Sequence, residues 1–353
     1  MKISRKRKII AIRILCTAAA VAAAVSAVLY FRPDIYLRLM QAAGFVEGEA
    51  NSFEAENEKE MRTLENSIEF IGDIPYESEY PNGFLDLYKT NIGDSKNAPL
   101  FFYIHGGGYA GGDKSEGDPA AASSDVEDAT QYLQTICQSG YNVVSINYAL
   151  APDYNYPVPV YQIDEAVRFL MENKEEYGIS TSHIVFSGGS AGGQLAGQYV
   201  NIQTNPEYAE QMGMEQTLGK EEVMGVVFNS ALLQPENFAK TDSFSNNFMF
   251  FEMRQQYFGG DKDIMDEADV IQHVADDFPP AYITDGNYGT FDQQAAELDQ
   301  RLAELGVYHI YNYYDRDTAK LPHGYDSYLD NKYARDNLEK TVDFLQMLKE
   351  DIS

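Results

Sequence analysis

The stretch Phe186-Ser187-Gly188-Gly189-Ser190-Ala191-Gly192-Gly193 places a G-x-S-x-G pentapeptide between an apolar run and an amphipathic segment. Residues 183–186 predict a strand, and residues 191–203 predict a helix. A sharp turn from strand to helix exposes a serine hydroxyl, and glycines two residues to either side let the strand and the helix approach closely. Ser190 is therefore the candidate nucleophile. From the pentapeptide alone, the alternative is a glycine-rich turn without a catalytic role.

A second glycine motif occurs earlier in the chain, where the apolar run at residues 99–104 ends in His105-Gly106-Gly107-Gly108. Successive glycines after a strand leave backbone N–H groups unshielded. Such groups can bind the oxyanion of a tetrahedral acyl intermediate, together with the N–H that follows the nucleophile. We therefore expect Gly106, Gly107 and Ala191 to supply the oxyanion and substrate-binding N–H groups.

Two further segments complete a family pattern. They are Ser145–Asp153, followed by Tyr156-Pro157-Val158-Pro159, and Pro322-His323-Gly324-Tyr325. In their order and spacing, the four segments resemble the hormone-sensitive lipase family of α/β-hydrolases, from about Pro81 to the C-terminus. The resemblance implies an α/β-hydrolase fold, a carboxylesterase or lipase-like activity and a catalytic role for His323.

Apolar runs alternate with segments of helical periodicity along most of the chain. This alternation predicts an α/β fold with a mostly parallel sheet covered on both faces by helices. The long insertion at residues 229–278 is interpreted as a helical cap. We expect strands at residues 84–87, 100–104, 143–146, 184–186, 223–228, 281–284 and 307–314, and helices at residues 126–137, 160–171, 194–200, 293–305 and 338–348.

The histidine positions support the assignment of the base independently of the resemblance. A hydrolase base lies in a loop at the carboxyl edge of the sheet. Of the five histidines, only His323 follows the last predicted strand and precedes the terminal helix. His323 is therefore the candidate general base, with an inert surface histidine as the alternative.

The acid of the triad is where the sequence departs from the family pattern. Residues 278–289 resemble the strand and turn that carry the family's aspartate, but the register that aligns Gly286 places Gly289 at that position. Asp285 and Asp292 are the nearest substitutes, and as ordinary residues they would be a turn residue and a helix cap. We favour Asp285, because a displaced carboxylate serves if it reaches Nδ1 of the imidazole. If neither carboxylate reaches it, Ser190 and the base form a slow dyad.

The amino terminus predicts a membrane leader. Residues 2–13 carry six Lys or Arg side chains, and the uncharged, apolar run Ile14–Phe31 follows. A run of about 18 residues just spans a hydrocarbon core, and the basic cluster places the start in the cytoplasm. Val25-Ser26-Ala27 fits a signal-peptidase site, so a cleaved leader and secretion are the alternative to a retained anchor. The predicted domains are the leader and anchor (1–31), a juxtamembrane or cap segment (32–80) and the hydrolase domain (81–353).

Charge and composition exclude several classes of protein. The chain has 55 acidic and 26 basic side chains, a net charge of −29, which opposes binding to nucleic acid. We predict no metal site, because H-E-x-x-H, paired-cysteine and EF-hand spacings are all missing, and we predict no cofactor. The expected partners are a small-molecule ester and, through the leader, the membrane.

Two classes of function agree with these features. The first is a serine esterase that forms an acyl-enzyme on Ser190, with a preference for short acyl chains because the insertion at residues 229–278 is dense in aromatics. The second is a membrane-anchored, α/β-hydrolase-like binding protein with weak or no catalysis. Only the missing family aspartate favours the second class.

Overall fold

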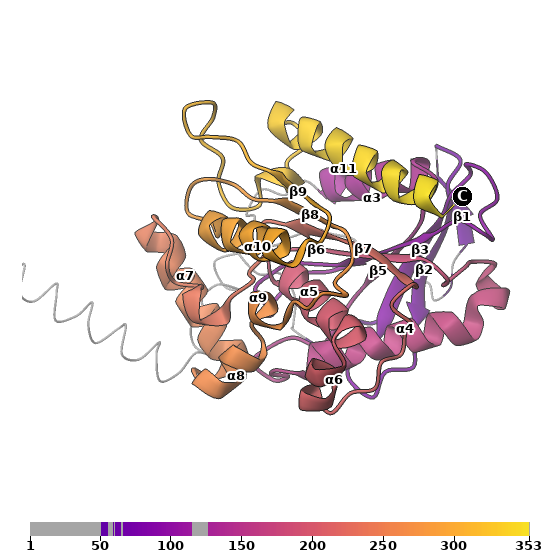
Figure 1. The fold of residues 1–353 in the computed structure, drawn as a ribbon. Coiled ribbons are helices and arrows are strands. Elements are labelled where there is room, and N and C mark those ends of the chain that lie inside the picture. Colours follow the sequence, from indigo (N-terminus) through magenta and orange to yellow (C-terminus); the bar gives the residue numbers. More distant parts are fainter. Residues whose placement is uncertain (1–50, 56–58, 60, 65, 115–125, 353) are drawn as a thin grey trace, which may run out of the picture.

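The computed structural model describes residues 51–55, 59, 61–64, 66–114 and 126–352. Nine strands of this part of the chain form one sheet, in the order β1-β2-β3-β5-β4-β6-β7-β8-β9 (Figure 1). The strands are β1 (Met61–Thr63), β2 (Glu69–Pro75), β3 (Phe84–Lys89), β4 (Leu100–Ile104), β5 (Asn142–Ile146), β6 (Ile184–Gly189), β7 (Val223–Asn229), β8 (Ala281–Thr284) and β9 (His309–Asn312).

Helices connect most of these strands. The α-helices are α3 (Val126–Gln138), α4 (Val158–Tyr177), α5 (Ala191–Thr204), α6 (Pro206–Met212), α7 (Phe244–Phe258), α8 (Lys262–Glu267), α9 (Val270–His273), α10 (Asp292–Leu305) and α11 (Lys332–Asp351). Short 3-10 turns span Pro235–Asn237 and Tyr325–Ser327.

The predicted fold class is confirmed. Six neighbouring strands, in the order β5-β4-β6-β7-β8-β9, pair in parallel. The other three pairings, β1 with β2, β2 with β3 and β3 with β5, are antiparallel. Every residue of β5, β7 and β8 is buried, because helices cover both faces of the sheet. Figure 1 shows α3 and α11 over one face, and α4 and α5 over the other. The buried side chains accordingly form two clusters, one on each face.

The sheet begins before residue 81, where the sequence analysis places the start of the hydrolase domain. β1 and β2 belong to the segment 32–80, which is predicted to be juxtamembrane or cap. Ile71 and Ile74 of β2 are buried in the core, but Asp73 between them has a φ of 52°, and the pairing with β3 shifts register there. This irregularity interrupts the alternation by which a strand is detected in sequence.

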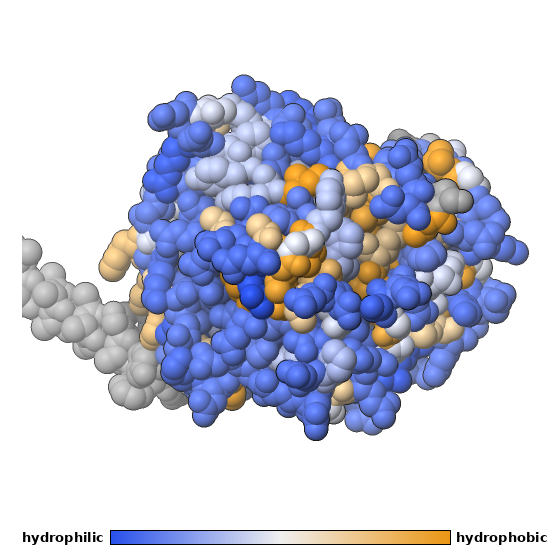
Figure 2. All heavy atoms as spheres, in the orientation of Figure 1, coloured by the Kyte–Doolittle hydropathy of each residue, from blue (hydrophilic) through white to orange (hydrophobic). Residues whose placement is uncertain are grey.

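The insertion between β7 and β8 forms the expected helical cap. It contains α7, α8 and α9, and α7 lies at one end of the molecule (Figure 1). The face shown in Figure 2 is mostly hydrophilic, with small apolar patches, as the excess of acidic residues predicts. No helix in the described part of the chain is long and apolar enough to cross a membrane. The predicted leader and anchor, residues 1–31, lie outside the described residues.

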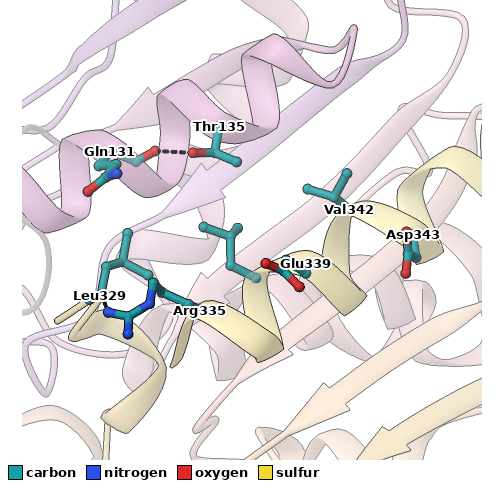
Figure 3. Close-up of a pocket in the computed structure, with 8 residues that line it drawn as sticks. Gln131, Thr135, Leu329, Arg335, Glu339, Val342 and Asp343 are labelled. Carbon is teal, nitrogen blue, oxygen red and sulfur yellow. Dashed lines mark hydrogen bonds between the residues drawn. The ribbon is translucent and has the colours of Figure 1, made fainter. Parts of the chain in front are cut away.

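A groove of about 500 Å³ lies between α3 and α11 (Figure 3). It lies in the helical layer on one face of the sheet, and none of the predicted site residues lines it. Its walls are formed by Gln131, Thr135, Leu329, Arg335, Leu338, Glu339, Val342 and Asp343.

Candidate active site

Ser190 lies on a strained turn between β6 and α5. Its φ of 53° and ψ of −117° are outside the regions that side-chain-bearing residues ordinarily adopt. The flanking glycines are required by close backbone approach: a Cβ on Gly188 would lie 2.3 Å from the carbonyl carbon of Gly192, and one on Gly192 would lie 2.1 Å from the carbonyl oxygen of Ile104. The turn therefore holds the serine at the carboxyl edge of the sheet, against the end of β4.

His323 lies in the loop between β9 and α11, and its Nε2 is 3.0 Å from Oγ of Ser190. The rings of Phe250 and Phe291 contact the imidazole edge-on, at centroid distances of 5.3 and 5.0 Å. This burial lowers the pKa of His323 to about 4. The imidazole is therefore neutral near pH 7, which is the state that accepts a proton from a serine hydroxyl.

The glycine loop after β4 has the backbone geometry that the sequence analysis anticipates. Gly107 and Gly108 have φ values of 98° and 59°, and a Cβ on Gly107 would lie 2.2 Å from the carbonyl oxygen of Gly111. Only glycine fits there without displacement of the backbone.

The Tyr148 hydroxyl orients this loop. It lies 3.0 Å from the carbonyl oxygen of His105 and 3.2 Å from that of Gly106, and Nδ1 of His105 donates to the Gly106 oxygen at 2.8 Å. In a trans peptide the carbonyl and the following N–H point in opposite directions. Anchoring both oxygens therefore turns the N–H groups of Gly106 and Gly107 away from Tyr148.

Asp285 lies at the end of β8, as predicted, and is buried, with 1% of its surface exposed. Its Oδ1 accepts hydrogen bonds from the Thr290 hydroxyl and from N–H of Gly286, and its Oδ2 accepts one from N–H of Phe291 at 3.1 Å. Burial raises the pKa of this carboxyl to about 8, although the Thr290 and Gly286 hydrogen bonds oppose the shift.

The prediction that Asp285 itself reaches Nδ1 of His323 differs from the structure. The group at Nδ1 is the Thr290 hydroxyl, 3.1 Å away, and it links the imidazole to the carboxylate. Sequence reasoning missed this residue because it looked only for a carboxylate near Gly289. The available signal was a hydroxyl-bearing side chain one position after the missing aspartate.

Asp292, the alternative acid, lies elsewhere. It is the first residue of α10. The N-cap position, which the sequence analysis gives as the ordinary alternative role for Asp292, is occupied by Phe291. Burial raises the pKa of Asp292, while the charge of Arg316 opposes this rise and that of Asp242 adds to it. In the described structure no hydrogen bond joins Asp292 to His323 or to Thr290.

Aromatic rings fill the space between the cap and the loops of the candidate site. Tyr109, directly after the glycine loop, stacks on Tyr257 of α7 at a centroid distance of 3.9 Å. Phe238 contacts Phe258 and Phe291 at 5.8 and 6.1 Å. With Phe250 on the imidazole, these rings connect the glycine loop to His323. Within the described residues, no group of three or more His, Cys, Asp or Glu side chains is placed to hold a metal ion.

A family model described as BD-FAE matches residues 85–302. The chain is 32% identical over 139 residues to carboxylesterase NlhH of Mycobacterium tuberculosis, an alignment that covers 39% of this chain and 37% of that protein. Lipase 2 of Moraxella sp. (strain TA144) is 38% identical over 100 residues, which cover 28% of this chain and 20% of the lipase. The matched segments therefore span less than half of these curated relatives.

Solved structures with the same fold cover more of the chain. Esterase B from Lactobacillus rhamnosis (HN001) superposes with a TM-score of 0.68 at 19% identity, over 93% of this chain and 96% of that one. The hyperthermophilic esterase of the archaeon Pyrobaculum calidifontis has a TM-score of 0.60 at 20% identity, over 78% of this chain and 85% of that one. These likenesses establish the fold that the strand order already indicates.

Proposed function

Because the chain belongs to the BD-FAE family of hormone-sensitive-lipase-like α/β-hydrolases, we propose that it is a serine hydrolase that cleaves carboxylic esters. The observation that carries the proposal is the 3.0 Å contact between Oγ of Ser190, on its strained turn, and Nε2 of His323. A nucleophile within hydrogen-bond reach of a neutral base is the arrangement that acyl transfer requires.

The proposed reaction has two halves. Oγ of Ser190 attacks the ester carbonyl carbon and its proton passes to Nε2 of His323, while the carbonyl oxygen becomes an oxyanion held by the N–H groups of Gly106, Gly107 and Ala191. The intermediate collapses to an acyl-enzyme, and the alcohol leaves with the proton from the imidazolium. A water molecule then attacks the acyl-enzyme, gives its proton to the same nitrogen, and releases the carboxylic acid and free serine.

Turnover by the full-length chain in detergent tests this proposal. We expect hydrolysis of p-nitrophenyl acetate and butyrate, measured as release of p-nitrophenolate and abolished by prior treatment with an organophosphonate. Binding of these esters without turnover would instead support the alternative, a membrane-anchored α/β-hydrolase-like binding protein.

We expect a preference for acyl chains of about two to eight carbons, because the aromatic rings of α7 and of the loops that it contacts occupy volume that a longer chain would need. The measurement is kcat/KM for a series of p-nitrophenyl esters at monomeric substrate concentrations. Phe250→Ala should raise the ratio of decanoyl to butyryl turnover by roughly tenfold, because about two methylenes of the longer chain would fit the vacated space and each contributes about 0.8 kcal/mol.

Phe244→Ala is the matched control for this series. Phe244 begins the same helix but is 89% exposed, so its removal should leave the ratio unchanged. Faster hydrolysis of palmitoyl than of butyryl esters by the wild type would contradict the short-chain assignment.

We also propose that the leader anchors the chain in a membrane with the catalytic domain on the extracytoplasmic side, or that the domain is secreted if the leader is cleaved. The support is the basic cluster before the apolar run Ile14–Phe31. Protease added to intact cells should therefore digest the anchored domain. Protection until the cells are lysed would show that the orientation is wrong.

A further inference from the structure

We propose that Thr290 is the positioning residue for His323. Its hydroxyl forms a hydrogen-bond relay between the imidazole and the buried Asp285, in place of a direct aspartate–histidine contact. This inference rests on the proposed function, because it concerns the protonation of the same base. The relay consists of two hydrogen bonds, from Nδ1 of His323 to Oγ1 of Thr290 at 3.1 Å and from that hydroxyl to Oδ1 of Asp285.

The direction of each hydrogen bond follows from the number of protons available. Above pH 8, where Asp285 is ionised, its carboxylate only accepts, and it already accepts from two backbone N–H groups. The single hydroxyl proton of Thr290 must therefore point to Asp285, so its oxygen presents a lone pair to the imidazole. Nδ1 of His323 must then carry the ring proton, which leaves Nε2 unprotonated toward Ser190. Thr290 thereby selects the tautomer that can act as a base.

The start of α7 explains why the family's aspartate is not found at position 289. Gly289 has a φ of 61°, and a Cβ there would lie 2.6 Å from the side-chain nitrogen of Asn246 and 3.0 Å from Cβ of Ser243. Its N–H donates to Asp242 at 2.6 Å, and its carbonyl accepts from Asn246 at 2.8 Å. An aspartate at this position would be strained at that φ and would have to displace the Asn246 amide that holds the loop.

The same contacts set the direction of the next residue. Asp242 accepts from the N–H of Gly289 and Asn246 donates to its carbonyl oxygen, so the loop is fixed directly before Thr290. Thr290 is 3% exposed, enclosed between β8 and the histidine loop. The hydroxyl therefore has a defined orientation, which a relay requires.

The test compares Thr290→Ser with Thr290→Ala, which differ only by the hydroxyl. We expect Thr290→Ala to lower kcat by roughly 10²- to 10⁴-fold, with KM little changed, as when the imidazole is held in the wrong tautomer. Thr290→Ser should stay within about tenfold of the wild type. Combining Thr290→Ala with Asp285→Asn should cost no more than the worse single change, because the two groups act as one unit.

Thr341→Val is the matched control. Thr341 of α11 is also buried and donates its hydroxyl to a backbone carbonyl, that of Asn337, but lies outside the site. We expect its kcat to equal that of the wild type. Equal damage in Thr290→Ser and Thr290→Ala, or near-wild-type kcat in Thr290→Ala, would overturn the relay and leave Thr290 with a packing role or none.

A second readout does not depend on turnover. In ¹⁵N NMR spectra at about pH 9, where Asp285 is ionised and His323 is neutral, we expect Nδ1 to carry the proton in the wild type and in Thr290→Ser. The His323 signals are assigned by their loss in His323→Gln. Thr290→Ala should show a mixture of tautomers. If the wild type hydrolyses no ester, the proposed function fails, but a tautomer that changes with the hydroxyl still supports the relay. An unchanged tautomer in Thr290→Ala overturns it.

Discussion

Ser190→Ala is expected to lower kcat for p-nitrophenyl butyrate by roughly 10⁵- to 10⁶-fold, because removal of a nucleophile leaves only the oxyanion groups and substrate binding. The same change should abolish the covalent adduct that an organophosphonate forms with the wild type, seen by intact-mass spectrometry. KM and the unfolding temperature should change little, since the lost hydroxyl contacts only His323 in the described structure.

Ser182→Ala provides the control for this variant. Ser182 is exposed and lies at the opposite end of β6 from Ser190, so its loss should alter neither turnover nor labelling. An adduct of equal yield on Ser190→Ala, or no adduct on the folded wild type, would remove Ser190 from the mechanism.

Asp285→Asn is expected to lower kcat by roughly 10²- to 10⁴-fold when measured about one pH unit above the pKa of Asp285. The carboxylate stabilises the imidazolium through the Thr290 hydroxyl, and an amide supplies no charge for that purpose. Asp292→Asn is the matched control, because Asp292 begins α10 and has no hydrogen bond to His323 in the described structure. Its effect should be limited to the helix-dipole contribution, about 0.5 kcal/mol of folding stability.

The pH dependence separates a charge effect from a structural one. Burial raises the pKa of Asp285 to about 8, so the carboxylate forms as the pH rises through that value. Burial lowers the pKa of His323 to about 4, so the base is already neutral over this range. We therefore expect kcat/KM of the wild type to rise toward pH 8 and above, and this rise to be missing in Asp285→Asn.

An Asp285→Asn variant that retains the alkaline rise would show that another group titrates. The reverse ranking, with Asp292→Asn the more damaging change, would transfer the role of the acid to Asp292. Near-wild-type kcat in both single variants and in the double variant would leave Ser190 and His323 as a dyad.

The motifs, in their order and spacing, and the alternation of apolar runs with helical segments were sufficient to predict the architecture. Gly188 and Gly192 are needed by any turn that brings strand, serine and helix so close together, so the local sequence specifies that geometry. The runs at residues 100–104, 143–146 and 223–228 contain no charged side chain, because both faces of their strands are covered. The family match confirms the resemblance that these motifs suggested.

What the sequence by itself determined is therefore the part encoded by local pattern: the buried strands, the serine turn, the glycine loop and the lone histidine after the last strand. Tertiary structure alone decided that β1 and β2 extend the sheet, since the register shift in β2 hides its alternation and β1 has only three residues, all exposed. It alone decided that Thr290, not a carboxylate, meets Nδ1 of His323. That contact depends on how the start of α7, more than 40 residues earlier in the chain, packs on Gly289. Contacts between residues so far apart leave no periodic trace in a single sequence.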